Sequence, residues 1–444
     1  MASPMPETPP RLYIETLGCA MNVRDSEHLI AQLRDKEGYV LTDQPQNADL
    51  ILINTCSVRE KPVSRLFSEI GIFGKTKQPH ARIGVCGCTA SHLGEEIIRR
   101  APAVDFVLGA RNTSKITDVL HRHHAVEVDI HYDETTYPFG DYRSNPYRAM
   151  VNITVGCDKS CTYCIVPHTR GDELSIPADL ILREIRNACD RGAKEVILLG
   201  QNVNNYGRRF GGGAGADEPR SFTELLRRVS RIPGLERIRF QSPHPLHMDD
   251  AFLEEFATNP KICKQIHVPL QSGSDRILRA MKRGYTQARF LERCATIRAR
   301  VPEATISTDV IVGFPGESEE DFEATMEVLE AVRFDQMFSF VYSPRPLTEA
   351  AQYADQIDRE TAGERLRRLQ ARHNAILDAS MQAQVGRVHS VYFDERKPDG
   401  RIAGRSDDGR LVFVAGGDEL VGTIRDVRIL SASRTALEGE PLEP

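Results

Sequence analysis

The sequence contains no tryptophan, and aromatic residues account for only 7% of its 444 positions. It also lacks any apolar run close to the roughly 20 residues that a membrane-spanning helix needs. The first ten residues are polar and rich in proline, with no basic segment followed by an apolar one, so we expect no secretory signal. These absences predict a cytoplasmic protein that does not enter a membrane.

An excess of basic charge is missing as well. Lysine and arginine number 57 against 63 aspartates and glutamates, which gives a formal net charge of −6. This sign is wrong for a generic nucleic-acid-binding protein, so any contact with RNA must come from local patches. The chain is also too long for one ordinary hydrophobic core, and we expect two or three domains.

Ten cysteines are present, and three of them fall within eight residues, at Cys157, Cys161 and Cys164. In a reducing compartment such thiols indicate metal binding or catalysis rather than disulfides. Structural zinc sites and fully protein-held iron–sulfur clusters normally take four ligands. Three close cysteines without an obvious fourth would leave one iron free for another ligand. The alternatives are a zinc site that recruits His168, or three unrelated thiols.

Residues 11–122 alternate short apolar runs with amphipathic stretches, a pattern that predicts βαβ units around a parallel sheet. The apolar runs are Leu12–Leu17, Leu50–Asn54, Arg82–Val85 and Val104–Leu108, and the helical stretches are Asp25–Arg34, Val58–Phe73 and Glu95–Arg100.

Three more cysteines, Cys19, Cys56 and Cys88, follow three of these predicted strands directly. The carboxyl ends of strands share one edge of a doubly wound sheet, so the three thiols are expected to converge into a second site. The competing interpretation is that they are ordinary buried cysteines. Cys86 is ambiguous because it lies two residues before Cys88, but Cys88 follows a glycine at which the chain can turn, and we choose Cys88.

Residues 123–148 show little periodicity and are interpreted as a connecting segment. The strand–helix alternation resumes over 149–378 and predicts a partial (β/α)6 barrel with its chemistry at the carboxyl ends of the strands. The expected strands are Ala149–Val155, Glu195–Leu199, Arg237–Phe240, Gln265–Val268, Ile306–Val312 and Met337–Tyr342. Polar, glycine-rich loops follow five of them.

Five arginines lie between residues 359 and 373, at positions 359, 365, 367, 368 and 372. They fit either the solvated face of a helix that covers the barrel, which is the better guess, or a basic patch for RNA. After residue 380 short alternating strands predict a small all-β barrel over 381–432. The residues after Ser431 are expected to be disordered.

The arrangement of these features resembles the radical S-adenosylmethionine (SAM) methylthiotransferases over about residues 11–430. The motifs that carry the resemblance are the three-cysteine loop, NTCSVREK at 54–61, VPHTRG at 166–171 and GQNVNNYG at 200–207. The resemblance implies a flavodoxin-like N-terminal domain, a radical SAM barrel and a C-terminal TRAM domain. The last three motifs are close to the tRNA-modifying branch of the family.

The resemblance also implies the chemistry. One 4Fe–4S cluster on Cys157, Cys161 and Cys164 would bind SAM and give a 5′-deoxyadenosyl radical. A second 4Fe–4S cluster, on Cys19, Cys56 and Cys88, would deliver a methylthio group to C2 of N6-isopentenyladenosine at tRNA position 37. Further contacts to SAM are expected from Tyr163 and, by loop position, from Gln201, Gln271 and Phe314.

The expected partners are the anticodon stem-loop of tRNA, which suits recognition of splayed bases in loops, an electron donor such as flavodoxin or ferredoxin, and a carrier of sulfur or clusters. The protein itself is expected to be a monomer. Methylthiolation of a ribosomal protein, or of threonylcarbamoyl-adenosine in tRNA, is the alternative. The sequence departs from the family pattern at Ile176, where arginine is usual, at Leu347 and Glu349, and at His168, where tyrosine is common.

Overall fold

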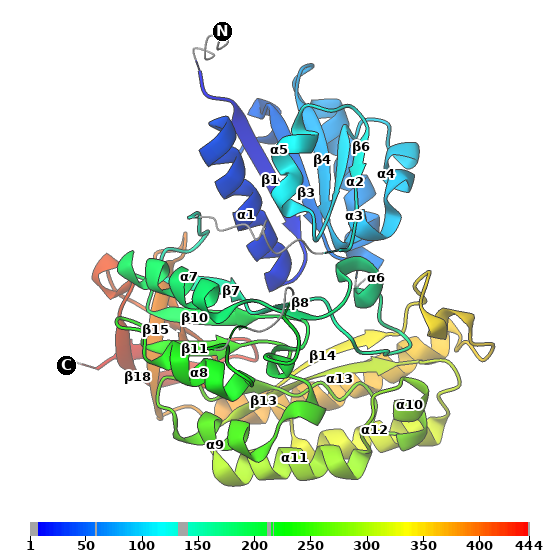
Figure 1. Cartoon of the computed structure of the whole chain (residues 1–444). Helices are drawn as coiled ribbons and strands as arrows, with labels where there is room; N and C mark the ends of the chain where they lie inside the picture. Colours follow the sequence, from blue (N-terminus) through cyan, green and yellow to red (C-terminus); the bar gives the residue numbers. More distant parts are fainter. Residues whose placement is uncertain (1–7, 58–59, 132–140, 211–214, 216, 443–444) are drawn as a thin grey trace.

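The computed structural model describes residues 8–57, 60–131, 141–210, 215 and 217–442. Three parts follow one another along the chain: a parallel sheet with helices, a set of six parallel barrel strands with their helices, and a closed barrel of five strands (Figure 1). The α/β fold class and the order of its parts agree with the sequence-based expectation. Among the described residues, no helix is both long enough and apolar enough to cross a bilayer.

The N-terminal sheet has six parallel strands in the order β2-β1-β3-β4-β5-β6. Their bounds are β1 (Arg11–Leu17), β2 (Val40–Leu41), β3 (Leu50–Thr55), β4 (Arg82–Gly87), β5 (Phe106–Gly109) and β6 (Ala125–Glu127). Thr55 is in register with both Leu17 and Gly87, so β1, β3 and β4 end level with one another. Residues 123–148 were expected only to connect two domains. This expectation is wrong for the first part of the segment, because β6 pairs with β5. Three residues are too few for a strand pattern to be visible in the sequence.

Helices cover both faces of this sheet. They are α1 (Ala20–Glu37), α2 (Glu60–Thr76), α3 (Cys88–Leu93), α4 (Glu95–Arg100) and α5 (Ile116–Leu120), with short 3-10 turns η1 (Pro45–Asn47) and η2 (Thr113–Lys115). Every residue of β3 is buried, as is typical of a strand covered on both sides. Leu50 and Leu52 join one apolar cluster, and Ile51 and Ile53 join the other.

The central part contains β7 (Arg148–Asn152), β10 (Glu195–Leu199), β11 (Arg237–Phe240), β12 (Gln265–His267), β13 (Thr305–Val312) and β14 (Gln336–Val341). These strands form two parallel groups, β7-β10-β11 and β12-β13-β14, which a bridge between Ile238 and Ile262 connects. A small antiparallel pair, β8 (Thr154–Val155) and β9 (Leu174–Ser175), follows β7. Six parallel strands in chain order make the partial barrel that the sequence predicted.

The helices of this part are α6 (Val166–Arg170), α7 (Ala178–Asp190), α8 (Phe222–Ser230), α9 (Asp250–Thr258), α10 (Asp275–Ala280), α11 (Gln287–Arg300), α12 (Glu319–Val332) and α13 (Arg359–Gln382), with 3-10 turns η4 (Val203–Asn205), η5 (Pro245–His247) and η6 (Glu349–Gln352). Three of the five arginines on α13 pair with glutamates at or on α12: Arg365 with Glu317, Arg368 with Glu323 and Arg372 with Glu330. The expected helix over the barrel is present, but its arginine face is not simply solvated, because Arg365 is buried and these pairs tie α13 to α12.

The C-terminal barrel closes in the order β15-β16-β17-β19-β18. Its strands are β15 (Val388–Arg396), β16 (Ile402–Ser406), β17 (Leu411–Val414), β18 (Ile424–Ala432) and β19 (Leu437–Pro441), with a 3-10 turn η7 (Asp418–Leu420). The predicted disordered tail after Ser431 is wrong, and so is a barrel that ends at 432. Residues 437–441 form the closing strand, and Leu437 is fully buried in the barrel core. A five-residue strand that contains glycine and proline gives little strand signal.

This small barrel sits at the amino ends of the central strands. Arg237, the first residue of β11, donates hydrogen bonds to the carbonyl oxygens of Arg405 and Ser390. Thr305, the first residue of β13, donates to the carbonyl oxygen of Asp408. The cysteine loop and the other polar loops lie at the opposite, carboxyl ends of the same strands.

Candidate active site

The first cysteine set lies in the loop that follows β8. Gly156 opens this loop with φ of +74°, and a β-carbon at this position would lie 2.0 Å from the carbonyl oxygen of Asp172. The Cys157 amide donates to the Gly171 carbonyl at 3.1 Å, and the Thr162 amide donates to the Met281 carbonyl at 3.2 Å. The loop is thus fixed on one side by the segment after α6 and on the other by the end of α10.

The thiols of this set influence one another electrostatically. Burial, followed by smaller effects that include the charge of Cys161, raises the pKa of Cys157 to about 11. Burial and then the charge of Cys161 raise the pKa of Cys164 to about 12. Arg283 lies beside them and donates a hydrogen bond from Nη1 to Cys161 Sγ at 3.2 Å. A buried cation at the thiols favours their ionised form, which is the form that binds iron.

Tyr163 and Phe314 belong to one apolar cluster beside this loop, together with Ile277, Met281 and Ala350. Phe314 is fully buried, and the hydroxyl of Tyr163 accepts a hydrogen bond from Arg283 at 3.4 Å. The structure therefore brings these two aromatic residues together next to the three cysteines.

The two glutamines occupy different places. Gln271 follows β12 with φ of +70°, and its backbone pairs with β13 through Asp309 and Ile311. Gln201 follows β10, and its side-chain amide contacts the sulfur of Met21 in α1. Because Met21 is only two residues after Cys19, Gln201 faces the N-terminal domain rather than the aromatic cluster.

The second cysteine set lies at the level edge where β1, β3 and β4 end. Cys19 is the N-cap of α1, Cys56 follows β3, and Cys88 is the first residue of α3. Cys19 is exposed, whereas Cys56 and Cys88 are buried. Cys19 and Cys88 lie at the amino ends of helices, where the helix dipole stabilises negative charge.

Two asparagines hold this edge together. Asn22 donates from Nδ2 to Asn54 Oδ1 at 3.1 Å, and Asn54 donates from Nδ2 to the carbonyl of Asn22 at 2.8 Å. Both side chains are fully buried. Because Asn54 lies two residues before Cys56 and Asn22 three after Cys19, this pair ties together the two segments that carry these thiols.

The turn between Cys86 and Cys88 separates their roles. Gly87 has φ of +92°, and a β-carbon there would lie 2.3 Å from Asn54 Oδ1. Cys86 is in the apolar core of the sheet with Leu29 and Leu52, and burial raises its pKa strongly. Cys88 instead lies at the edge with Cys19. That Cys88 is the ligand of this set stays a prediction.

Arg170 reaches this second set from the central part of the chain. The buried side chain donates from Nε to Cys88 Sγ at 3.2 Å and from Nη2 to Asp25 Oδ2 at 2.6 Å. An interaction with the Cys56 thiol, and then the charge of Arg170, lower the pKa of Cys19 to about 6. Ionisation is thus favoured at Cys19, whereas burial raises the pKa of Cys88 despite the nearby charge of Arg170.

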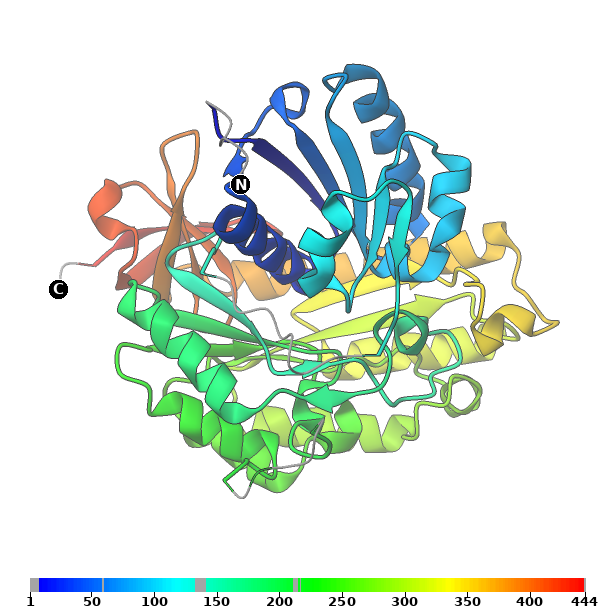
Figure 2. The ribbon, with the colours of Figure 1, turned by 45° about the horizontal axis from the view of Figure 1, so that its top comes forward.

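The short helix α6 links the two cysteine sets. It begins at Val166, directly after the Cys164 loop, and ends at Arg170. It packs against α3, which begins with Cys88, and α1 lies against β7 (Figures 1 and 2). Cys164 and Arg170 are only six residues apart in the sequence. The two sites are consequently adjacent at the carboxyl edge of both sheets.

Some of the buried polar atoms that have no hydrogen-bond partner among the described residues lie at or shortly after the strand ends at the edges where the two sets lie. Near the barrel edge they are Asn152 Oδ1, Thr154 Oγ1, Gln201 Oε1, Asn202 Oδ1 and Asn205 Oδ1, and near the second set they are Thr55 Oγ1, Ser57 Oγ and Thr89 Oγ1. The amide groups of Asn202 and Asn205 donate to Glu173, which anchors the GQNVNNYG loop. Buried polar atoms normally have partners, so these positions suit a polar ligand or a cluster.

The donor sets fit iron–sulfur clusters better than zinc. Within the described part of the chain, no three His, Cys, Asp or Glu side chains converge on a single metal ion. His168, the candidate fourth ligand of a zinc site, is exposed on α6. Three cysteines without a fourth protein ligand leave one corner of a 4Fe–4S cluster open.

The departures from the family pattern have plain structural places. Ile176 is buried in the barrel core, so this position provides no basic contact. Leu347 is 64% exposed with φ of +73°, and Glu349 pairs with Lys282 on the surface. Val58 and Arg59 of the NTCSVREK motif lie outside the described residues.

Sequence analysis assigned no role to Arg170, Asp25, Arg283 or the two asparagines. Arg170 and Asn54 lie inside motifs that were used for the resemblance, and that is the one signal that could have marked them. The contacts of Arg170 and Arg283 with the two cysteine sets and with Asp25, and the contact between the two asparagines, span 32 to 145 residues of sequence, so no local pattern predicts them.

Three family models match the chain. The radical SAM superfamily matches residues 151–329, the Uncharacterized protein family UPF0004 matches residues 11–109, and the TRAM domain matches residues 382–442. The matches fall on the central strands, the N-terminal sheet and the C-terminal barrel, respectively. Each cysteine set lies within a different one of the first two.

Full-length relatives carry one name. The chain is 68% identical over 429 residues to a protein of a Sulfurovum species and 63% identical over 432 residues to one of a Nitratiruptor species. Each alignment covers 97% of this chain and 99% of the relative, and both relatives are named tRNA-2-methylthio-N(6)-dimethylallyladenosine synthase. Among solved structures, a radical SAM methyltransferase, TsrM, from Kitasatospora setae has a TM-score of 0.57 at 12% identity, over 84% of this chain and 90% of that one. That likeness concerns the fold alone.

Proposed function

The chain belongs to the tRNA-2-methylthio-N(6)-dimethylallyladenosine synthase family of radical SAM methylthiotransferases, and from this premise we propose that its two cysteine sets hold two separate 4Fe–4S clusters. The enzyme is a tRNA methylthiotransferase that modifies C2 of N6-dimethylallyladenosine (isopentenyladenosine). The observation that carries the assignment of the sites is α6, which places one three-cysteine set directly beside the other.

Cys157, Cys161 and Cys164 would hold the cluster that binds SAM, and Cys19, Cys56 and Cys88 would hold the auxiliary cluster. When bound, the first cluster with SAM supplies the radical that removes hydrogen from C2, and the second supplies the sulfur. The protein supplies position and exclusion of water and oxygen.

Several residues of the chain have defined tasks in this arrangement. Tyr163 and Phe314 form an apolar wall beside the SAM-binding cysteines and exclude water there. Arg283 holds Cys161 and Tyr163 in place through one guanidinium group. Gln271 stands at the end of β12 as a further candidate contact to SAM.

Gln201 has a different place in the proposal. Its position against Met21 assigns it to the space between the two sites, where the adenine base must lie to be reached from both. Its Oε1 atom, which has no hydrogen-bond partner among the described residues, is available to an amino group of the base. This moves Gln201 from the SAM contacts expected from the sequence to the substrate side.

Further parts of the proposal concern substrate and partners. Position 37 beside the anticodon suits the site, because a base in a loop can be splayed out of its stack to reach a protein site. The clusters require an electron donor of the flavodoxin or ferredoxin class and a source of sulfur, and a cytoplasmic monomer would meet its tRNA without other subunits. We place the domains at residues 11–127, 148–380 and 381–442, with the connecting segment between the first two.

Expression in a bacterium that lacks its own tRNA methylthiotransferase, followed by mass spectrometry of tRNA nucleosides, tests the proposal. We expect the methylthio-isopentenyl nucleoside from the wild type and none from a Cys88→Ala variant. Replacing Cys157, Cys161 and Cys164 by alanine should abolish 5′-deoxyadenosine formation, whereas replacing Cys19, Cys56 and Cys88 should retain it and abolish sulfur insertion. Sulfur insertion by the second variant contradicts the auxiliary site. Unmodified isopentenyladenosine with both clusters loaded would favour a protein substrate.

A further inference from the structure

Arg170 joins the barrel segment to a cysteine of the auxiliary set through a hydrogen bond. The residue is 3% exposed and has two partners in the N-terminal domain, Cys88 and Asp25. Asp25 is 4% exposed and comes from α1, whereas Cys88 begins α3. One buried cation therefore fixes a helix, a cysteine and a buried carboxylate relative to one another.

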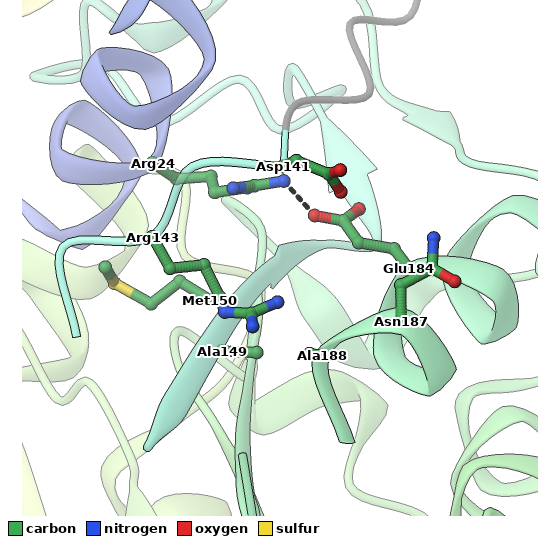
Figure 3. A pocket seen from close by; sticks show the side chains of 8 residues that line it. All are labelled: Arg24, Asp141, Arg143, Ala149, Met150, Glu184, Asn187 and Ala188. Carbon is green, nitrogen blue, oxygen red and sulfur yellow. Dashed lines mark hydrogen bonds and ion pairs between the residues drawn. The ribbon is translucent and has the colours of Figure 1, made fainter. Parts of the chain in front are cut away.

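The surroundings of this contact are polar. The apolar clusters formed by described residues of the N-terminal sheet and of the barrel are separate. A charged pair joins the domains instead: Arg24 on α1 bonds to Glu184 on α7, as Figure 3 shows, and is also paired within α1 with Glu27. Arg111 donates to the carbonyl oxygen of Arg170. The distance between the two domains therefore depends on how firmly these polar contacts hold them together.

We propose that Arg170 and Asp25 are a positioning pair for the auxiliary cluster. Arg170 holds Cys88, and with it the cluster, at a fixed distance from the SAM-binding loop, and Asp25 offsets the positive charge that Arg170 brings to the cluster. This inference rests on the proposed function, since it needs a cluster on Cys19, Cys56 and Cys88. A hydrogen bond to a ligating sulfur and a nearby charge are two means by which proteins set the reduction potential of a cluster.

The two residues must act on the potential with opposite signs. Reduction adds an electron to the cluster, so a nearby positive charge favours it and a nearby negative charge opposes it. Replacing Asp25 by Asn removes the negative charge and keeps an oxygen that accepts from Arg170. Adding Arg170→Gln to that variant then removes the positive charge without leaving a buried carboxylate unpaired, which a lone Arg170→Gln change would do.

The experiment uses full-length protein in which Cys157, Cys161 and Cys164 are alanine, so that only the auxiliary cluster forms. After anaerobic reconstitution, a redox titration followed by electron paramagnetic resonance gives the midpoint potential. We expect a shift to a more positive potential for Asp25→Asn, and a shift back to more negative values for Asp25→Asn/Arg170→Gln. Glu195→Gln/Arg239→Met, which removes both charges of a buried pair on the side of the central strands that meets the C-terminal barrel, is the matched control and should leave the potential unchanged.

A second readout uses the enzyme with all six cysteines. Arg170→Lys keeps the charge but loses the two-pronged geometry, so we expect the yield of methylthiolated tRNA per 5′-deoxyadenosine to fall about 10- to 100-fold, the range found for residues that orient metal ligands. Formation of 5′-deoxyadenosine itself should continue.

The outcomes distinguish a failure of the proposed auxiliary cluster from a failure of the Arg170–Asp25 positioning pair. If the triple-alanine background binds no iron, the proposed auxiliary cluster fails. If it binds about four irons per chain and the potentials of both variants equal the parent's, the positioning pair is wrong. Shifts of the same sign in both steps would equally overturn it, because a general loss of structure does not depend on the sign of the charge removed.

Discussion

Arg283 donates a hydrogen bond to the sulfur of Cys161 at 3.2 Å, across 122 residues of sequence. Arg170 makes the equivalent contact to Cys88 in the other cysteine set, also at 3.2 Å. The partners of the two arginines differ: Arg170 pairs with the Asp25 carboxylate, whereas Arg283 has the phenols of Tyr163 and Tyr285 among the described side chains. Each candidate cluster thus has one buried arginine at a ligand, but only one of these charges is offset by an acid.

The first prediction concerns Arg283. Replacement by Gln removes the positive charge at Cys161 and loosens Tyr163, so we expect 5′-deoxyadenosine formation to fall about 10- to 100-fold. Anaerobic single-turnover assays with quantified iron would measure it. Arg289→Gln, which breaks an exposed pair with Glu292 on α11, should have no effect. Unchanged SAM cleavage in Arg283→Gln at full iron content would show that the contact is incidental.

The second prediction separates Cys86 from Cys88. Cys86→Ala leaves a small cavity in the core of the sheet and should lower the free energy of unfolding by about 1 kcal/mol, with auxiliary iron retained. Cys88→Ala should keep the fold and lose that iron. Iron analysis and thermal unfolding of both variants, in the background without the SAM-binding cysteines, give the comparison. Iron lost from Cys86→Ala and kept by Cys88→Ala would reverse the assignment.

The third prediction is a pH dependence centred on His244. Burial, and then the charge of Arg283, lower the pKa of this histidine to about 2, and its Nδ1 accepts a hydrogen bond from the Leu246 amide. His244 takes up a proton near pH 6.5 in the unfolded chain but stays neutral at this pH in the folded chain. Stability is therefore lost as the pH falls below 6.5, by about 1.4 kcal/mol per pH unit for this one group.

Urea unfolding of wild type and His244→Gln at about pH 7.5, 6.5 and 5.5 would show how the free energy of unfolding of each protein changes with pH. The variant should lose less stability than the wild type between the two lower values. Equal losses would mean that His244 is protonated in the folded protein.

The fourth prediction concerns the closing strand of the C-terminal barrel. Truncation after Ala432 removes β19, exposes the core around Val427 and leaves β17 and β18 without their partner. We expect a loss of soluble protein and of bound tRNA. Removal of residues 443 and 444 alone is the control and should change neither. A truncated protein with full tRNA affinity would mean that β19 is dispensable.

Elements with a strong periodic pattern were predictable from the sequence. Residues Glu195–Leu199 and Arg237–Phe240 have the bounds that were expected. The first is a short apolar run, and the second alternates arginine with an apolar residue. The short strands β6 and β19 were missed, since three or five residues carry almost no period and their pairing depends on strands already in place.

The candidate site also has features that the sequence predicts and features that it does not. The positions of strand ends were enough to predict that Cys19, Cys56 and Cys88 follow three strands at one sheet edge, because strand patterns are local. That each cysteine set holds a cluster stays a prediction. The contacts of Arg170, Asp25 and Arg283 were not predictable, because each joins segments that only the folded chain brings together. Gln201 was expected to contact SAM because of its loop position, but its side chain turns toward Met21. A loop position predicts at which edge of the sheet a residue lies, but not the direction in which its side chain points.

The docking of the C-terminal barrel at the amino ends of the central strands sets a length scale for the substrate. The six cysteines lie at the opposite ends, and β13, with eight residues, spans about 26 Å at the usual rise of a strand. An RNA held by both the small barrel and the cysteine edge must bridge at least this span along the outside of the molecule. An isolated nucleoside or a very short hairpin could reach only one end of this span, whereas a folded tRNA is long enough to contact both the small barrel and the cysteine edge.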